Sequence, residues 1–147
     1  MAVRILTKEN EPAVYVLDWT TAERVLQNAY VDATKADIYA FVTYKSDDGY
    51  ELGIAVGGDR SVLSYQSANG EPPYMASLGT VMRHSEVLTA YAWFAHHTEF
   101  PGDYAIPWSQ ALAATQQFFE GMRPPEAVTW QMVERSRPLA NNGMQLT

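Results

Sequence analysis

Residues 37–67, with the sequence DIYAFVTYKSDDGYELGIAVGGDRSVLSYQS, decide the fold of this 147-residue chain. Three stretches within them, 37–45, 50–56 and 61–67, are rich in the β-branched and aromatic residues that favour strands. Asp-Gly at 48–49 and Gly-Gly at 57–58 supply the positive φ angles that tight turns need. Short strands that follow one another through such turns predict an antiparallel meander.

Further strand signals flank this meander. Residues 13–17 (AVYVL) and 74–78 (YMASL) predict short strands, and 127–130 (AVTW) predict a closing strand. We interpret 87–97 (VLTAYAWFAHH) as one strand rather than a buried helix, because its neighbours form a meander and its side chains can alternate between two faces. The stretch 98–106, which contains a proline followed by a glycine, is expected to be a loop.

Two amphipathic helices are predicted, one over residues 20–30 or slightly longer and one over residues 107–120. Thr20 suits the N-cap of the first helix as part of a capping box, and apolar residues follow at the spacing of one helical stripe. Pro107 suits the first turn of the second helix, and Gly121 suits the position after its last turn. The sequence therefore predicts an α+β fold in which an antiparallel β-sheet meander has both helices packed against one face.

The length of the chain fits one domain, which needs neither a disulfide nor a metal to fold. We expect residues 1–134 to form this domain and the polar residues 135–147 to be a disordered tail. No stretch approaches the roughly 20 apolar residues of a membrane helix, and the first residues lack a signal-peptide pattern. Cysteine is absent, which excludes thiol nucleophiles and is compatible with a cytoplasmic location.

The chain is acidic, with a net charge of −7 from 17 acidic and 10 basic residues. Between Ser46 and Asp103 there are eight acidic residues and two basic ones, so almost all of the excess arises there. Nucleic-acid binding rests on Lys and Arg that neutralise phosphates, so nucleic acid is an unsuitable partner for this chain. A basic protein is a more suitable one.

Catalytic and cofactor motifs are missing from the sequence. It contains no Gly-x-Ser-x-Gly elbow, no phosphate-binding loop and no dinucleotide fingerprint. The most tempting metal-ligand group is His84, His96, His97, Glu99 and Asp103. However, adjacent residues of a strand, such as the two neighbouring histidines, point to opposite faces. We therefore expect no enzymatic activity, no metal and no cofactor.

The last third of the chain carries a family pattern in residues 106–130, IPWSQALAATQQFFEGMRPPEAVTW. This segment resembles the C-terminal segment of the first numbered immunity-protein family of bacterial polymorphic toxin systems. The pattern comprises a helix of small residues ending in Phe, a short link, and a closing Pro-x-x-hydrophobic-x-Trp. The matching positions are Ala111, Phe118 or Phe119, Gly121, Pro125, Val128 and Trp130. We expect a structural role for the motif residues, which are Trp108, Phe118, Phe119, Gly121, Pro125, Val128 and Trp130. Of these, Phe118 and Trp130 are expected to be buried.

The resemblance implies an immunity protein that binds and neutralises a cognate toxin domain without catalysis. Toxins of such systems, deaminases and nucleases among them, need basic surfaces to hold nucleic acid. An acidic protein would complement a basic toxin domain, and this step rests on charge alone. Neither nucleic acid nor a membrane is an expected partner. The candidate contact residues, taken from turns, strand ends and the loop before the second helix, are Asp47, Asp48, Glu51, Asp59, Glu71, Tyr74, Glu86, Trp93, Glu99, Asp103 and Tyr104.

Two alternatives remain open. The chain could be a small enzyme or ligand-binding protein with a pocket between sheet and helices near His96, His97 and Tyr104. It could instead be a structural domain that associates with itself through an exposed sheet edge. A deep cavity lined by facing titratable groups would favour the first alternative, and a dimer with a large apolar interface would favour the second.

Overall fold

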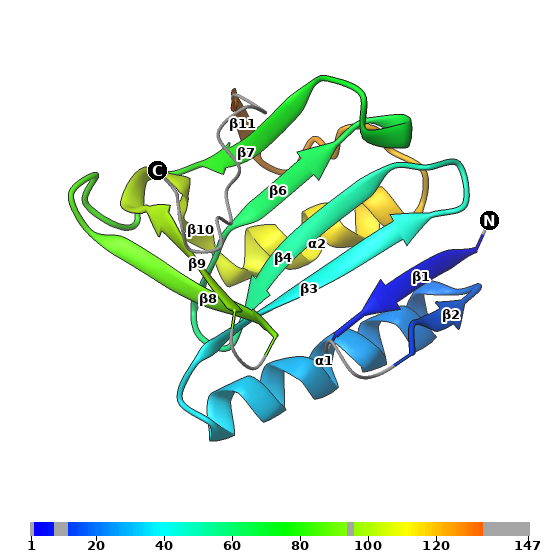
Figure 1. Cartoon of the computed structure of the whole chain (residues 1–147), viewed down its shortest axis with the longest axis horizontal. Coiled ribbons are helices and arrows are strands. Elements are labelled where there is room, and N and C mark those ends of the chain that lie inside the picture. Colours follow the sequence, from blue (N-terminus) through cyan, green and yellow to red (C-terminus); the bar gives the residue numbers. More distant parts are fainter. Residues whose placement is uncertain (1, 8–11, 94–95, 134–147) are drawn as a thin grey trace.

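A computed structural model of the chain describes residues 2–7, 12–93 and 96–133. Its main sheet runs in the order β11-β7-β6-β4-β3-β1-β2, with the pair β8 and β9 attached beside β3 (Figure 1). The strands are β1 (Val3–Leu6), β2 (Val14–Val16), β3 (Tyr39–Ser46), β4 (Glu51–Val56), β6 (Leu63–Gln66), β7 (Tyr74–Leu78), β8 (Val87–Trp93), β9 (His96–Pro101) and β11 (Thr129–Met132). The helices are α1 (Trp19–Lys35) and α2 (Trp108–Phe119), which confirms the predicted α+β fold.

The predicted antiparallel meander is present in strands β3, β4, β6 and β7. Gly49 adopts a φ of 95° in the turn between β3 and β4, as the Asp-Gly pair predicts. The single strand predicted over 61–67 is wrong, because the chain divides around the buried Val62. β5 (Arg60–Ser61) leaves the main sheet and pairs with β10 (Ile106–Pro107), while β6 continues the meander.

The predictions lack one strand and need correction on two further points. β1 was not predicted, because its four residues are too short a segment to show a clear period. The strand predicted over 87–97 is two antiparallel strands, β8 and β9, and β9 occupies part of the loop predicted over 98–106. β8 also runs parallel to β3, so the sheet is not a pure antiparallel meander. Leu88 and Phe100 face each other across β8 and β9, and this shared buried side explains the pairing.

Both helices form where they are predicted, with different ends. The N-cap of α1 is Asp18, not Thr20, because the Asp18 carboxylate accepts a hydrogen bond of 2.8 Å from the Thr21 backbone nitrogen. α1 continues past residue 30 to Lys35, which buries Ala33 in an additional turn. α2 ends as predicted, with Gly121 at a φ of 102° donating its backbone N–H to the Phe118 carbonyl.

Two clusters of buried side chains cover the two faces of the sheet. The larger cluster joins residues of α1 and α2 to β1, β3, β4 and β6, which confirms that both helices pack on one face. The smaller cluster lies on the opposite face, where Phe100 of β9 stacks at 5.8 Å from Phe41 of β3. The hairpin of β8 and β9 therefore covers one end of the second face. The predicted tail, 135–147, lies outside the described residues. Neither of the described α-helices is long and apolar enough to cross a membrane.

Candidate functional site

Four of the predicted contact carboxylates come together at one end of the sheet. Asp47 and Asp48 occupy the turn between β3 and β4, Glu51 begins β4, and Glu71 lies in the loop between β6 and β7. The turn and the loop touch, since the Asn69 backbone nitrogen donates to the Gly49 carbonyl at 3.2 Å. We call these four carboxylates the acidic end; its segments lie at the upper right of Figure 1.

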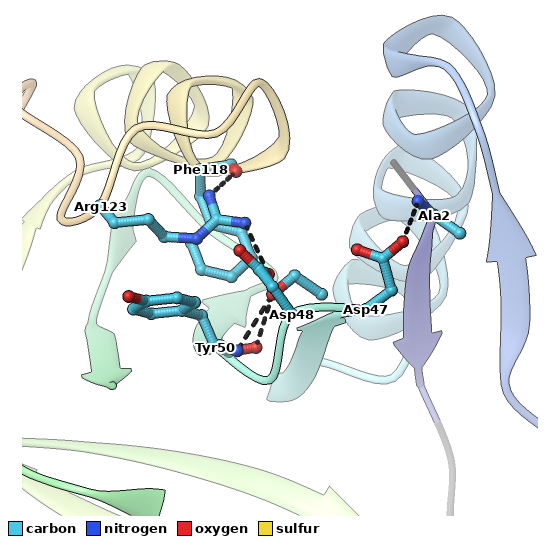
Figure 2. A network of polar contacts seen from close by, with 7 residues as sticks. Ala2, Asp47, Asp48, Tyr50, Phe118 and Arg123 are labelled. Carbon is cyan, nitrogen blue, oxygen red and sulfur yellow. Dashed lines mark hydrogen bonds and ion pairs between the residues drawn. The ribbon is translucent and has the colours of Figure 1, made fainter. Parts of the chain in front are cut away.

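Asp47 is tied to the beginning of the chain. Its Oδ2 accepts a 3.1 Å hydrogen bond from the Ala2 backbone nitrogen (Figure 2). The backbone nitrogen of Asp47 donates to the Ala2 carbonyl, also at 3.1 Å. The two bonds fix the turn against β1, whose Val3 also pairs with Ser46 at the end of β3. The Asp47 side chain stays exposed. It is therefore both held in position and accessible to a partner.

Asp48 is held from the other side by Arg123, which follows α2. Arg123 Nη2 lies 3.5 Å from Asp48 Oδ1, and the Ser46 hydroxyl donates to the same oxygen (Figure 2). Ser46 Oγ in turn accepts a 3.0 Å hydrogen bond from the Tyr50 backbone nitrogen. Half of the Asp48 side-chain surface remains accessible, compared with 10% for Arg123. The ion pair thus presents its negative member to solvent.

The Arg123 guanidinium lies between two aromatic rings. Its central carbon lies 4.2 Å from the centre of the Phe118 ring and 5.1 Å from that of Tyr50. Nη1 donates to the Phe118 carbonyl at the end of α2. A planar guanidinium suits this position because it can stack on rings while it forms hydrogen bonds at its edge. Arg123 therefore connects the end of α2 to the acidic end.

The remaining members of the acidic end lie across neighbouring strands. Glu51 pairs with Lys45 on β3, at a distance of 3.9 Å between Oε1 and Nζ, and is half-buried. Its cross-strand neighbour on β6 is Gln66, which pairs in turn with the candidate Tyr74 on β7. The Tyr74 hydroxyl donates to the Gly70 carbonyl at 2.5 Å. The candidate Tyr74 therefore lies beside the loop that carries Glu71.

The contacts of Asp48 lower the pKa of its carboxyl group below the ordinary 3.8, first through the Ser46 hydroxyl and then through the Arg123 charge. Partial burial raises the pKa, but its effect is smaller than that of the Ser46 hydroxyl. A carboxylate that is stabilised in the folded state contributes to stability at neutral pH and loses that contribution once it is protonated. Asp48 therefore remains charged at physiological pH.

This shift predicts a pH dependence of stability. Lowering the pH from 5 towards the depressed pKa of Asp48 is expected to reduce the free energy of unfolding, because the unfolded chain takes up the proton first. An Asp48→Asn variant should be less stable than wild type at pH 7, and the difference should shrink as the pH falls. Urea titrations from pH 7 to pH 2.5 measure this. A constant difference across that range would contradict the assigned role of the Asp48 charge.

A second set of candidates lies around β8 and β9, away from the acidic end. Glu86 Oε1 accepts a 2.8 Å hydrogen bond from the Arg83 backbone nitrogen, and Glu99 Oε2 lies 3.7 Å from His97 Nε2. Asp103 Oδ1 lies 3.4 Å from His84 Nδ1. These carboxylates therefore have local partners. The backbones of the candidates Trp93 and His96 lie at the other end of this strand pair.

Asp59 is separate from both sets. It is exposed in the turn after β4, at the opposite end of that strand from Glu51. Its backbone carbonyl accepts a 2.9 Å hydrogen bond from the Trp108 nitrogen at the start of α2. The acidic residues between 46 and 103 thus form two sets and a separate residue rather than one patch.

The residues of the family pattern have packing roles. Phe118 is fully buried and Phe119 nearly so, and the Trp108 ring lies 4.9 Å from that of Tyr30. Trp130 donates its ring N–H to the Pro125 carbonyl at 2.8 Å and packs beside Tyr65. The expectation that Trp130 is buried is wrong, because its indole is only half-buried at the sheet edge formed by β11. Gly121, Pro125 and Val128 form the link between α2 and this edge strand.

Arg123 and Ser46 are the residues of this site that sequence reasoning missed. Both stand next to residues that were singled out, Arg123 within the link of the family pattern and Ser46 before the Asp-Asp-Gly turn. The one sequence feature that marks Arg123 is its place in the link of the family pattern, directly before two prolines. Its contact with Asp48 joins residues far apart in sequence, which a local pattern does not reveal.

The alternative site near His97 and Tyr104 does not have the expected geometry. Tyr104 packs against the smaller cluster, which contains no residue of α1 or α2, so it does not lie between the sheet and these helices. Burial raises the pKa of its phenol, with the Asp103 charge adding to the effect. Among residues 2–7, 12–93 and 96–133, no group of three or more His, Cys, Asp or Glu side chains is arranged to hold a metal ion.

The α+β scaffold thus holds exposed carboxylates on adjoining segments at one end of the sheet. The family model described as Immunity protein Imm1 matches residues 10–132, most of the chain. The chain therefore belongs to the Imm1 family of immunity proteins, and this membership makes it an immunity protein against a toxin. A search of curated proteins found no match.

Proposed function

We propose that this immunity protein neutralises a toxin that acts on nucleic acid, by covering the basic substrate surface of the toxin with the acidic end. The observation that carries this proposal is the Asp48–Arg123 contact, together with the bonds between Asp47 and Ala2. These contacts hold two exposed carboxylates in fixed positions before any partner arrives. Inhibition then requires binding alone, with no catalytic step, and would take place in the cytoplasm.

Fixed carboxylates favour a tight complex for two reasons. A surface that is ordered before binding loses less conformational entropy when the complex forms. Charge of one sign on adjoining turns also accelerates the encounter with an oppositely charged partner and favours the correct orientation. A specific complex of this kind buries about 1,600 Å² in total, which exceeds the area of four carboxylates. The acidic end would therefore be part of a larger interface.

The proposal is tested by reversing charges at the acidic end. In Asp47→Lys/Glu71→Lys, two exposed carboxylates become cations while the Asp48–Arg123 contact is left in place. Cells that express the cognate toxin should be protected by wild type and not by this variant. Titration calorimetry at 50 mM salt should show at least a hundredfold weaker binding, because close charge pairs across an interface contribute several kcal/mol in total.

The matched control is Asp32→Lys/Asp59→Lys, which makes the same change in net charge at exposed positions away from the acidic end. This variant should protect as well as wild type, with binding weakened less than threefold. Circular dichroism melts establish that both variants are folded. If the two double variants bind equally well, net charge rather than the acidic end governs association. If wild type neither binds nor protects against its toxin, inhibition by direct binding is wrong.

A further inference from the structure

Two large side chains protrude from β2, the edge strand of the main sheet. Tyr15 is 68% exposed and Leu17, which follows the strand, is 75% exposed. Among the described residues up to position 93, they are the two most exposed large hydrophobic residues. Val16, between them, is buried and packs in the cluster beneath the helices. An exposed tyrosine and an exposed leucine on the same side of one short segment indicate a contact surface.

The position of this pair makes it continuous with the acidic end. Tyr15 pairs with Arg4 on β1, Arg4 pairs with Lys45 on β3, and Lys45 pairs with Glu51. Cross-strand partners share one face of a sheet, so Tyr15 and Glu51 face the same side, about 15 Å apart at the usual strand spacing. That side is opposite to the helices, since the Val16 side chain points towards them.

Leu17 lies at the same end of the sheet as Asp47. Its neighbour Val16 pairs with Val3, and Val3 pairs on its other side with Ser46, the residue before Asp47. Figure 1 shows the end of β2 and the start of β1 together at the right of the molecule. Both anchoring residues are therefore within the area of one protein interface, about 800 Å² on each partner.

The charges around the pair specify the partner. Asp18 follows Leu17 directly, and the Thr21 backbone and hydroxyl hold the pKa of its carboxyl below the ordinary value. Asp47, Asp48 and Glu51 extend the negative charge along this end of the sheet. With Asp18 they make four carboxylates, against the three nearby cations Arg4, Arg24 and Lys45. A surface that covers Leu17 must therefore present an apolar centre with cations around it. A second copy of the chain does not, since it would bring like carboxylates together.

We propose that Tyr15 and Leu17 are the apolar anchor of the toxin interface, inserted into an apolar depression that basic residues of the toxin surround. This inference rests on the proposed function. It names the apolar part of the interface, which the four carboxylates do not supply. Aromatic and aliphatic anchors that become fully desolvated account for most of the binding energy of many interfaces. The surrounding carboxylates set the rate of encounter and the orientation.

The test uses Tyr15→Ser and Leu17→Ser in the full chain, with the purified cognate toxin domain as the probe. Each variant should bind at least tenfold more weakly, mainly through faster dissociation. The dependence of affinity on salt should remain that of wild type, because no charge changes. The matched control is Met132→Ser, which removes an equally exposed apolar side chain, 68% accessible, from β11 at the opposite edge of the sheet. It should bind within twofold of wild type.

The outcomes separate this inference from the proposed function. If wild type binds the toxin and both serine variants bind as tightly, the anchor is elsewhere and the inference is overturned while the proposed function stands. If wild type does not bind the toxin, the proposed function fails and the inference fails with it. If sedimentation shows a wild-type dimer that Leu17→Ser dissociates, the occupant of this surface is a second copy, which also overturns the inference. Unchanged melting temperatures establish that the variants are folded.

Discussion

Replacing Phe118 by alanine is expected to lower the free energy of unfolding by about 3–5 kcal/mol, the range observed when large aromatic side chains are removed from protein cores. Phe118 is fully buried on α2, within the cluster that joins both helices to the sheet. The Arg123 guanidinium also rests on its ring. The substitution therefore opens a cavity and removes one side of the Arg123 site.

Urea denaturation at pH 7 measures this loss, and two further variants calibrate it. Met122→Ala removes a side chain that is 37% exposed in the link after α2, and it should change stability by less than about 1 kcal/mol. Trp130→Ala should cost less than Phe118→Ala, because the indole is only half-buried. A loss below 1 kcal/mol for Phe118→Ala would show that the central cluster does not depend on this ring.

Replacing Arg123 by methionine is expected to cost about 2–3 kcal/mol, typical of a lost hydrogen bond to a charged group together with a lost ring contact. The methionine fills much of the same volume but cannot donate to the Phe118 carbonyl or pair with Asp48. Asp48 is half exposed, so water can solvate the remaining carboxylate and keeps the cost below that of breaking a fully buried pair.

A double-mutant cycle with Asp48→Asn separates the ion pair from the ring contacts. The coupling free energy between positions 48 and 123 should be about 0.5–1 kcal/mol, because the pair is partly solvated. Arg123→Lys should recover little, since an ammonium group lacks the planar fork that fits between the rings. If Arg123→Lys is as stable as wild type, a positive charge alone is sufficient at this position. If Arg123→Met is as stable as wild type, the connection between α2 and the acidic end is not stabilising.

Local patterns were sufficient for the meander and for both helices. The Asp-Gly turn at 48–49 and the amphipathic stripe of α2 are properties of consecutive residues, and the structure has both. No pattern of consecutive residues predicts the pairing of β3 with β8. Tyr39 and Ala90 pair in parallel register because the hairpin of β8 and β9 folds over Phe41, and that contact exists only in three dimensions. For the same reason the local pattern of residues 98–106 predicts a loop, although residues 98–101 belong to β9.

The candidate site was predicted by residue type but not by arrangement. Charge counts indicated Asp47, Asp48 and Glu71, which do lie together, and they indicated Asp59 and Glu99 equally, which lie elsewhere. Proximity in sequence does not distinguish the two ends of a strand such as β4. The role of Arg123 is not visible in the sequence for a related reason, because its partner Asp48 is distant in the sequence.

The two neighbouring carboxylates of the acidic end are held by opposite regions of the polypeptide, Asp47 by Ala2 and Asp48 by Arg123. A short synthetic peptide that spans the turn therefore lacks both restraints and would present the same charges without their fixed geometry. Under the proposed function, toxin binding at the acidic end would therefore depend on the folding of the whole chain, because a partially unfolded or truncated molecule lacks these restraints. A conformation-sensitive antibody raised against this turn would distinguish molecules in which both restraints are formed from molecules that are merely soluble.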